Sequence, residues 1–519
     1  MEKPELVNMT IAQLLRKTAA EYKDRTALFS EDRYLTYGEL DALTDRIASG
    51  FVRDGLARGD IAGLFCNTSL EGLVFFYALL KAGARVLLFP EKIHEEKLGN
   101  YFRCKDQKAI VCDSSHYEQF GDRNEVNRFP YRYLTEEVSR EGWKGLADLT
   151  AEEPLVEYPD GDPFDTEVML FTSGSTGDPK IVCTSGYSRV NGGIQQAYDQ
   201  RMTCEDIVCE ALPIHHCFAL SVNVIASLAS GAALYIPPDR HTKTIYDALR
   251  RHRCTVLSAV PTLYNALITK QDVENGEICL REGIIGGGRY TPDQFKMIDQ
   301  SFGEGFTLIS SLGMTEGTAG VTVCEINDDI GVRSTTVGHF MNQVEGKIAD
   351  PETGVELPCG QKGEIVFRGY NVMQGYYQNP EETAKAIDAA GFLHSGDLGW
   401  LDEKGYLHMA GRIKELIIRG GENISPAEIE NALLSDRRIR DCLAVGIPDE
   451  HWGEVVCACV VAEGLSEQEI QKIAAEKLER SKVPSFVVFM DAIPVNANNK
   501  VDAKKCRMIA LEKLGIKVD

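Results

Sequence analysis

A run of small polar residues at positions 170–180, LFTSGSTGDPK, carries the kinds of group that bind phosphate. Its glycines permit positive φ, so that backbone N–H groups can converge, and its hydroxyls and lysine add donors and a cation. The candidate phosphate-binding residues are Thr172, Ser173, Gly174, Ser175, Thr176, Gly177 and Lys180. The spacing of a Walker loop, G-x-x-x-x-G-K-[ST], is absent. The run predicts a phosphate-binding loop of another kind, although SGSTG alone would also fit a surface turn.

A second polar run, SLGMTEG at positions 311–317, follows a segment at 306–310 that we expect to be a strand. A strand end with threonine and glutamate suits a hydroxyl on phosphate and a carboxylate on Mg²⁺, because Mg²⁺ in nucleotide sites takes one or two carboxylates plus phosphate oxygens. The run HSGD at 394–397 places Asp397 just beyond a glycine. A carboxylate can accept hydrogen bonds from two vicinal ribose hydroxyls. A solvated loop aspartate is the ordinary alternative.

Two adjacent histidines and a cysteine at positions 215–217 raise the question of a metal site. Neighbouring side chains point apart and no second pair of ligands is close in the sequence, so we do not expect a metal there. A triple glycine at 286–288 follows a predicted strand at 283–285. A flat ligand could approach the backbone at these glycines, but a turn would explain them equally well.

The elements around these runs indicate an α/β protein with more than one domain. Residues 9–89 alternate helical patterns with apolar strand-like segments, which predicts a parallel sheet covered by helices. Residues 114–163 are acidic and irregular, and we expect little regular structure in them. After position 426 a helix, two strands, a capped helix that begins at Ser466 and a further strand predict a compact α+β unit. A single core stops growing near about 250–300 residues, so 519 residues require at least two domains.

Composition excludes several classes of function. The formal net charge of −23 argues against a nucleic-acid or anionic-membrane partner, so any anionic substrate must be met by local positive charges. The 15 cysteines are scattered and form no C-x-x-C pair, which favours reduced thiols. The first residues are charged, and no stretch reaches about 18 apolar residues. We expect a cytoplasmic protein without a transmembrane segment.

Taken together, the phosphate-binding run and three later landmarks resemble the adenylate-forming superfamily of acyl-CoA ligases, peptide-synthetase adenylation domains and luciferases. The landmarks are GEIVFRG at 363–369, GYYQNP at 375–380 and GRIKELIIRGGENISPAEIE at 411–430. The chain is most similar to acyl-CoA ligases. The resemblance implies a large N-terminal domain of stacked mixed and parallel sheets with helices, at residues 1–411, and a small mobile α+β C-terminal domain, at 412–519. Lys414 occupies the hinge position of the family.

The resemblance also assigns roles to individual residues. Thr315 would bind phosphate, Glu316 would hold Mg²⁺, and His216 would lie beside the carboxylate to be activated. Lys500, in the loop IPVNANNKVD at 493–502, matches the lysine that promotes adenylation, and Gly421 would flank the pantetheine arm of the thiol. The implied nucleotide-binding residues are Thr172, Ser173, Gly174, Ser175, Thr176, Gly177, Lys180, Gly287, Gly288, Leu312, Gly313, Asp397 and Arg412.

This sequence departs from the family at two of these positions. Leu312 stands where the family usually has an aromatic residue that stacks on adenine, and Asn499 stands where it usually has glycine. Asn tolerates left-handed φ, so the second change is mild. The first puts the affinity for ATP, or the pose of its base, in question.

The function that follows from the resemblance is that of an ATP-dependent carboxylic acid:CoA ligase. ATP, Mg²⁺ and coenzyme A would be its cofactors, and an acyl-adenylate its intermediate. One alternative is a stand-alone adenylation enzyme that loads an acyl or aryl acid onto a carrier protein. Another is a nucleotide-binding regulator that has lost the chemistry, for which Leu312 and Asn499 are the support. The sequence does not name the acid.

Overall fold

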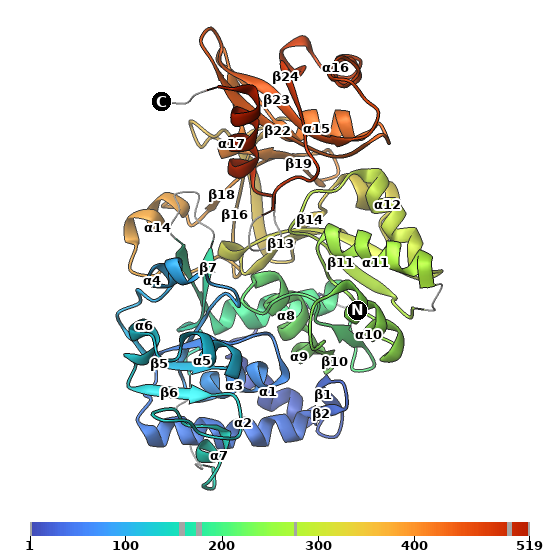
Figure 1. Cartoon of the computed structure of the whole chain (residues 1–519). Helices are drawn as coiled ribbons and strands as arrows, with labels where there is room; N and C mark the ends of the chain where they lie inside the picture. The colour runs from blue at the N-terminus through green and yellow to red at the C-terminus, as the bar shows by residue number, and fades with distance from the viewer. Residues whose placement is uncertain (1–2, 155–160, 173–178, 275–277, 496–500, 517–519) are drawn as a thin grey trace.

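The computed structural model describes residues 3–154, 161–172, 179–274, 278–495 and 501–516. Figure 1 shows a large N-terminal part and, at the top of the view, a smaller C-terminal part. Both are mixed α/β structures, as the sequence predicts. The exact boundary at residue 412 stays a prediction. Within the described residues, none of the helices is both long enough and apolar enough to cross a bilayer.

A seven-stranded sheet forms one layer of the large part, with strand order β17-β8-β7-β4-β3-β5-β6. Strands β6, β5, β3, β4 and β7 run parallel, and β8 and β17 are added antiparallel at one edge. The strands are β3 (Ile61–Phe65), β4 (Arg85–Leu88), β5 (Gln107–Cys112), β6 (Tyr131–Leu134), β7 (Thr166–Thr172), β8 (Lys180–Ser185) and β17 (Gly375–Tyr376). The parallel sheet expected from the first ninety residues is confirmed.

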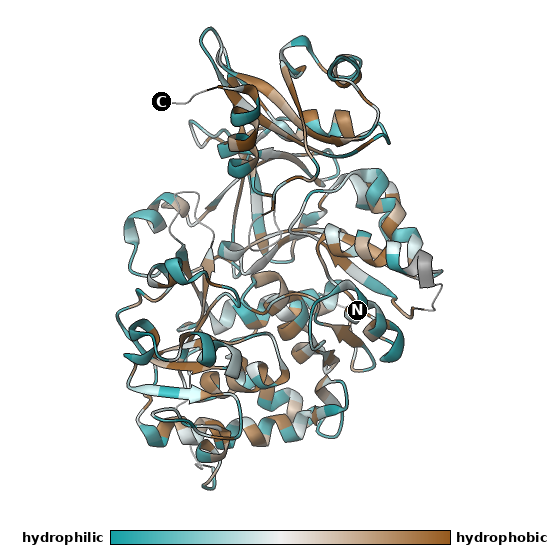
Figure 2. Ribbon diagram, viewed as in Figure 1, coloured by the Kyte–Doolittle hydropathy of each residue, from teal (hydrophilic) through white to brown (hydrophobic). Residues whose placement is uncertain are grey.

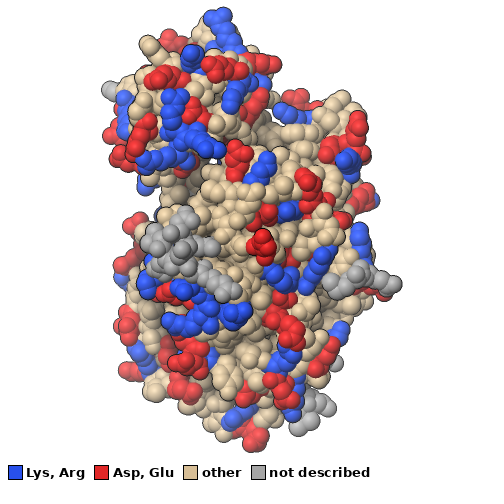
Figure 3. Space-filling model, turned by 90° about the vertical axis from the view of Figure 1, so that its right-hand side faces the viewer, with Lys and Arg blue, Asp and Glu red and all other residues tan. Residues whose placement is uncertain are grey.

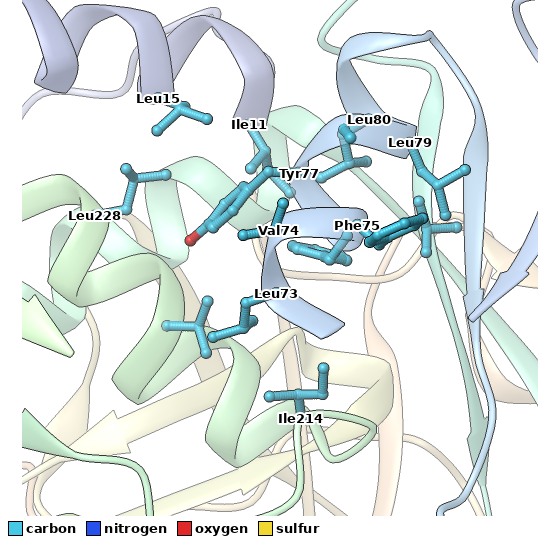
Figure 4. Close-up of a cluster of buried hydrophobic side chains, with 14 of the residues drawn as sticks. Ile11, Leu15, Leu73, Val74, Phe75, Tyr77, Leu79, Leu80, Ile214 and Leu228 are labelled. Carbon is cyan, nitrogen blue, oxygen red and sulfur yellow. The ribbon is translucent and has the colours of Figure 1, made fainter. Parts of the chain in front are cut away.

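Helices α1 (Ile11–Glu21), α2 (Tyr37–Asp54) and α3 (Leu70–Lys81) pack together beside this sheet. Helix α3 begins at the N-cap Ser69, whose side chain accepts a hydrogen bond from the N–H of Gly72. Nearly all its residues are buried, and each fully buried Leu or Phe side chain contributes about 1.5–3 kcal/mol of stability. Figure 4 shows its side chains packed with Leu228 and Ile214, so one core joins α3 to a distant loop at 211–218.

Residues 114–163 contain more regular structure than the sequence suggests. They include α5 (Ser114–Phe120), α6 (Asn124–Asn127), β6 and α7 (Leu146–Leu149). Apolar residues such as Val126 and Trp143 are buried in a cluster on the seven-stranded sheet, and this burial outweighs the acidic composition. A short 3₁₀ turn, η1 (Glu95–Lys97), and α4 (Leu98–Tyr101) precede this segment.

Two four-stranded sheets form the middle of the large part. The first has the order β2-β1-β10-β9 and the second the order β11-β12-β13-β14. Their strands are β1 (Thr26–Ser30), β2 (Arg33–Thr36), β9 (Ile207–Cys209), β10 (Ala233–Tyr235), β11 (Glu282–Ile285), β12 (Thr307–Met314), β13 (Ala319–Val323) and β14 (His339–Phe340). The surrounding helices are α8 (Gly186–Asp199), the π-helix η2 (Ala219–Ile225), α9 (Ala226–Ser230), α10 (Thr242–Arg251), α11 (Pro261–Glu274), α12 (Pro292–Ser301) and α13 (Ile330–Thr335). Single β-bridges through Val256 connect the two sheets.

An antiparallel sheet with the order β15-β16-β18-β19 leads toward the small part. Its strands are β15 (Val344–Ala349), β16 (Gly363–Gly369), β18 (Leu393–Leu401) and β19 (Leu407–Arg412), and α14 (Pro380–Ala386) lies between β17 and β18 in the chain. The 3₁₀ turn η4 (Ile413–Glu415) follows β19 directly. The chain therefore passes into the C-terminal part at a strand end.

The small part is a five-stranded sheet with helices packed against it. It contains β20 (Ile417–Arg419), β21 (Glu422–Ile424), α15 (Pro426–Leu434), β22 (Ile439–Asp449), β23 (Gly453–Ala462), α16 (Glu467–Ala475), η5 (Arg480–Lys482), β24 (Phe486–Phe489) and α17 (Ala503–Leu514). Figure 2 shows hydrophobic residues along its strands, where two buried clusters form its own core. The predicted α+β unit is confirmed, and the helix capped by Ser466 ends at Ala475, earlier than its pattern suggests.

Candidate functional site

A cavity of about 910 Å³ lies at the carboxyl ends of several strands of the large part. Carboxyl ends of strands are the usual place for ligands in α/β proteins. The loop 211–218 after β9, the glycines after β11 and the end of β12 all line it. Of the residues singled out from the sequence, His216, Gly287, Gly313 and Thr315 face this one cavity. The fold thus joins motifs that lie far apart in the chain.

The loop that carries His216 is fixed at several points. Ile214 is buried in the core beside α3, and its N–H donates to Thr68 Oγ1 at 3.0 Å. The N–H of His216 donates to the carbonyl of Pro213 at 3.0 Å, which closes a tight turn. The rings of His215 and His216 lie 4.6 Å apart. His216 therefore lines the cavity from a loop that is anchored by hydrogen bonds and by the core.

Burial, with the nearby Arg240 guanidinium, lowers the pKa of His215 to about 3, so this imidazole is neutral at physiological pH. Neutral imidazole could ligate a metal, but the described residues contain no group of three or more His, Cys, Asp or Glu side chains placed to hold one. His215 is instead a wall residue of the cavity.

Thr315 and Glu316 occupy the short 3₁₀ turn η3 (Thr315–Gly317) that directly follows β12. The hydroxyl of Thr315 lies 3.6 Å from the Sγ of Cys217, across the cavity wall. Glu316 accepts a hydrogen bond at Oε1 from the hydroxyl of Tyr376, at 2.9 Å, and its carbonyl accepts the N–H of Met373 at 2.8 Å. The carboxylate is thus held in place from the neighbouring edge strand.

Tyr376 also connects Glu316 to the phosphate-binding run. The ammonium of Lys180 lies 4.6 Å from the centre of the Tyr376 ring, and it forms an ion pair with Glu382 on α14. Hydrogen bonds from Lys180 and Lys385 lower the pKa of Glu382 to about 2. Tyr376 was not a predicted site residue, although its place in the landmark GYYQNP was a signal that could have found it.

Thr172 and Lys180 face each other as cross-strand partners at the ends of β7 and β8. The run between them therefore connects two antiparallel strands. The predicted residues Ser173, Gly174, Ser175, Thr176 and Gly177 lie outside the described residues, as do Asn499 and Lys500. Their assignments stay predictions.

Asp397 and Arg412 are also cross-strand partners, on β18 and β19. Arg412 Nε lies 3.0 Å from Asp397 Oδ1, and the side chain of Asp397 is 10% exposed while that of Arg412 is 63% exposed. Burial raises the pKa of Asp397, although the Arg412 charge opposes the shift. Two residues assigned separately to the nucleotide are thus directly paired.

The remaining predicted residues lie at the edges of the site or beyond it. Lys414 and Gly421 are exposed on the small part, and Gly421 has a φ of +88°. Gly288 is exposed beside Pro261. Leu312 packs against the buried cluster of Val337, Ile348, Ile365 and Leu407, whereas its neighbour Gly313 lines the cavity. Contact of Leu312 with an adenine stays a prediction.

A polar network that no sequence motif indicates also lines the cavity. Glu91 accepts hydrogen bonds from the N–H and hydroxyl of Thr68, at 2.9 and 2.6 Å, and forms an ion pair with Arg240. These side chains come from loops after β3, β4 and β10, and none belongs to a motif. Only the tertiary structure brings them together.

Known proteins match this chain over nearly its full length. The family model described as AMP-binding enzyme matches residues 15–377, and the model of the AMP-binding enzyme C-terminal domain matches residues 428–500. A putative acyl-CoA synthetase of Bacillus subtilis, YngI, is 30% identical, and the match covers 99% of each chain. The mitochondrial medium-chain acyl-CoA ligase ACSF2 of Rattus norvegicus is 28% identical over 97% of this chain and 88% of its own.

Solved structures agree with these relatives. ATP-bound MatB of Rhodopseudomonas palustris superposes with a TM-score of 0.87, at 28% identity, over 98% of this chain and 100% of its own. The o-succinylbenzoate CoA synthetase MenE of Bacillus subtilis, in complex with ATP and a magnesium ion, superposes with a TM-score of 0.82, at 25% identity, over 96% of this chain and 100% of its own.

Proposed function

This chain belongs to the family of AMP-binding enzymes, and from that premise we propose that it is an ATP-dependent carboxylic acid:CoA ligase. The acid first reacts with ATP to give an acyl-adenylate and pyrophosphate. The thiol of coenzyme A then takes the acyl group, and AMP leaves. Relatives named as acyl-CoA synthetases and ligases, which match nearly the full length of this chain, support this reaction.

The observation that carries the proposal is the single cavity that contains His216, Gly287, Gly313 and Thr315. A carboxylate and an α-phosphate are both anions, so a common site must hold them together and offset their repulsion. Thr315 lines this large, partly apolar cavity, and Glu316 follows it in the same polar turn. This arrangement suits an acid whose carboxylate meets a nucleotide beside that turn.

The residues around Glu316 fit a Mg²⁺ ion that arrives with ATP. Such an ion takes one or two protein carboxylates and completes its shell with phosphate oxygens and water. Glu316 supplies one carboxylate, and the hydrogen bond from Tyr376 orients it. When bound, Mg²⁺ would offset the negative charge of the phosphates.

The nucleotide would extend from this point toward Asp397. Its ribose hydroxyls would donate to the Asp397 carboxylate, in competition with Arg412. The run between Thr172 and Lys180 would surround the phosphates, with Lys180 passing from Glu382 to phosphate.

The second half-reaction requires the thiol to approach the acyl carbon. We assign Lys500 to adenylation, Gly421 to the pantetheine arm and Lys414 to the hinge between domains at 1–411 and 412–519. A Cβ added at Gly421 would meet no described atom within 4 Å in this arrangement. Contact between Gly421 and a thiol arm would therefore need the small domain to rotate toward the cavity.

A panel of carboxylic acids, scored for pyrophosphate release with and without CoA, tests the proposal. We expect at least one acid to release pyrophosphate and to yield its CoA thioester. If pyrophosphate is released but the acyl group is transferred only to a carrier protein, the acceptor is that protein and not CoA. Absence of release with every acid in the panel would contradict the proposal and favour a nucleotide-binding regulator.

A further inference from the structure

Arg189, on helix α8, carries a positive charge that the described residues leave without a counterion. Its side chain is 0% exposed. Its Nε donates to Thr184 Oγ1 and its Nη1 to Ser221 Oγ, both at 2.9 Å, and both acceptors are neutral. Its Nη2 is buried and has no hydrogen-bond partner among the described residues. No carboxylate of the described chain forms an ion pair with it.

A buried, unpaired charge is normally avoided because its desolvation is not repaid. Many groups escape the cost by changing protonation state, but arginine does not do so at neutral pH. Burial lowers the pKa of Arg189 to about 10, which still leaves the guanidinium protonated at physiological pH. The fold therefore maintains a positive charge in its interior.

This charge lies directly behind the wall of the cavity. Ser221, which accepts from Arg189, donates in turn to the carbonyl of Thr318 at 2.9 Å. Val222, next to Ser221 in the chain, lines the cavity, and so does Cys217. Cys217 contacts the hydroxyl of Thr315 and is close enough to act electrostatically on Arg189. The guanidinium is thus linked to two stretches of the cavity wall, through Ser221 beside Val222 and through Cys217.

We propose that Arg189 is the buried countercharge for the carboxylate of the acid substrate. The inference rests on the proposed function and deepens it. The protein has a net charge of −23, so an anion needs a local positive potential in order to bind. A guanidinium in a low-dielectric interior supplies that potential through the wall without contacting the substrate. Arg189 is thus a positioning residue, and the substrate completes a charge pair that the free protein lacks.

The α-phosphate of ATP is a second anion near Thr315, and steady-state kinetics distinguish the two. Arg189→Met keeps much of the side-chain volume and removes the charge, whereas a lysine at this buried position is charged only when the pH lies below its lowered pKa. We expect Arg189→Met to raise KM for the acid about tenfold or more at every pH with little change in KM for ATP, and Arg189→Lys to approach the wild-type KM for the acid only as the pH is lowered. An equal rise in both KM values would assign the charge to the nucleotide and overturn the proposal, as would unchanged acid kinetics.

Thermal unfolding separates this role from a structural one. Removal of an uncompensated buried charge should leave the unfolding midpoint of Arg189→Met equal to or above that of wild type. If the arginine had a structural role, its replacement would lower the midpoint.

If Arg189→Met does not fold, Cys217→Asp provides the test. Its carboxylate should be tolerated near Arg189, and Cys217→Ser is the neutral control. A much lower midpoint for Cys217→Asp than for Cys217→Ser would contradict the proposal. Acid-dependent pyrophosphate release by the wild-type protein tests the function itself, so the two failures are distinguishable.

Discussion

At the scale of single residues, the site depends on side chains that hold other side chains. Tyr376 contacts Glu316 with its hydroxyl and Lys180 with its ring. It connects the carboxylate assigned to Mg²⁺ with the cation assigned to phosphate. Glu316 and Lys180 were predicted from motifs, whereas Tyr376 reaches both of them because the edge strand β17 pairs with β8.

We predict that Tyr376→Phe weakens adenylation through Glu316 alone. The ring and its contact with Lys180 remain, but the hydroxyl that orients the carboxylate is lost. Loss of an outer-shell partner typically costs about 10–100-fold, so the Mg²⁺ concentration for half-maximal pyrophosphate release should rise by about that factor. Tyr377→Phe is the matched control, because its hydroxyl binds Asp106. An unchanged Mg²⁺ dependence in Tyr376→Phe would remove this role.

Lys500→Ala tests the residue on which adenylation is proposed to depend. Loss of one preorganised electrostatic contact should slow pyrophosphate release by about 10²–10³. Thioester formation from supplied acyl-adenylate should change much less. Lys505→Ala, an exposed position on α17, is the control. If both half-reactions fall equally, Lys500 does not have the proposed role.

At the scale of elements, the loop 211–218 rests on an acidic group in the core. Glu210, just after β9, is buried, and its Oε1 accepts from the N–H of Leu212 at 3.0 Å and from Asn223 Nδ2 at 3.1 Å. Its Oε2 and Asn223 Oδ1 have no hydrogen-bond partners among the described residues. Burial raises the pKa of Glu210 to about 8, and a proton on Oε2 would give this pair the donor that it lacks.

The sign of the resulting pH dependence follows from this shift. Between the unfolded pKa of about 4.3 and the folded value of about 8, the native state binds the proton and the unfolded state does not, so stability falls as pH rises. We predict that Glu210→Gln, which keeps a permanent donor, removes about one proton from the slope of the unfolding free energy against pH in this window. Urea unfolding from pH 5 to 8 measures the slope, and a wild-type slope in Glu210→Gln would refute the assignment.

Local patterns predicted the elements well and the interior of the site poorly. The parallel strands β3 and β4 and the capped helix α16 follow from periodicity and capping, because those signals are local. The pairing of Glu91 with Arg240 and the unpaired charge of Arg189 depend on segments that meet only in the folded protein. The packing of Leu312 is likewise not predictable from local patterns, because its motif position does not reveal that it packs against the cluster around Val337.

At the scale of the whole molecule, charged contacts link the large and small parts. On the face shown in Figure 3, positive and negative side chains are interspersed over both parts. Arg289, just after the triple glycine, forms ion pairs with Glu415, at 2.6 Å, and with Glu430 on α15. The side chain of Glu430 is only 4% exposed, so it depends on Arg289 for compensation of its charge. These contacts favour the arrangement of the two parts described here.

We predict that Arg289→Gln changes the two half-reactions unequally. Without the ion pairs, the small part rotates away from the arrangement described here more easily. The half-reaction that uses this arrangement should therefore slow relative to the other half-reaction. Pyrophosphate release and thioester formation from supplied acyl-adenylate measure the two separately. Arg438→Gln is the control, because Arg438 pairs with Asp436 within the small part. Equal changes in both half-reactions would show that Arg289 does not bias the arrangement.

The central claim is that an acid is joined to AMP before it reaches sulfur, and the fate of its oxygen tests this directly. An acid that releases pyrophosphate would be labelled with ¹⁸O in its carboxylate and incubated with the protein, ATP and CoA. Attack of the carboxylate on the α-phosphorus, followed by thiol displacement of AMP, leaves one labelled oxygen in AMP. Mass spectrometry should find that label in AMP. Label in inorganic phosphate or pyrophosphate, or thioester formed without labelled AMP, would contradict the account.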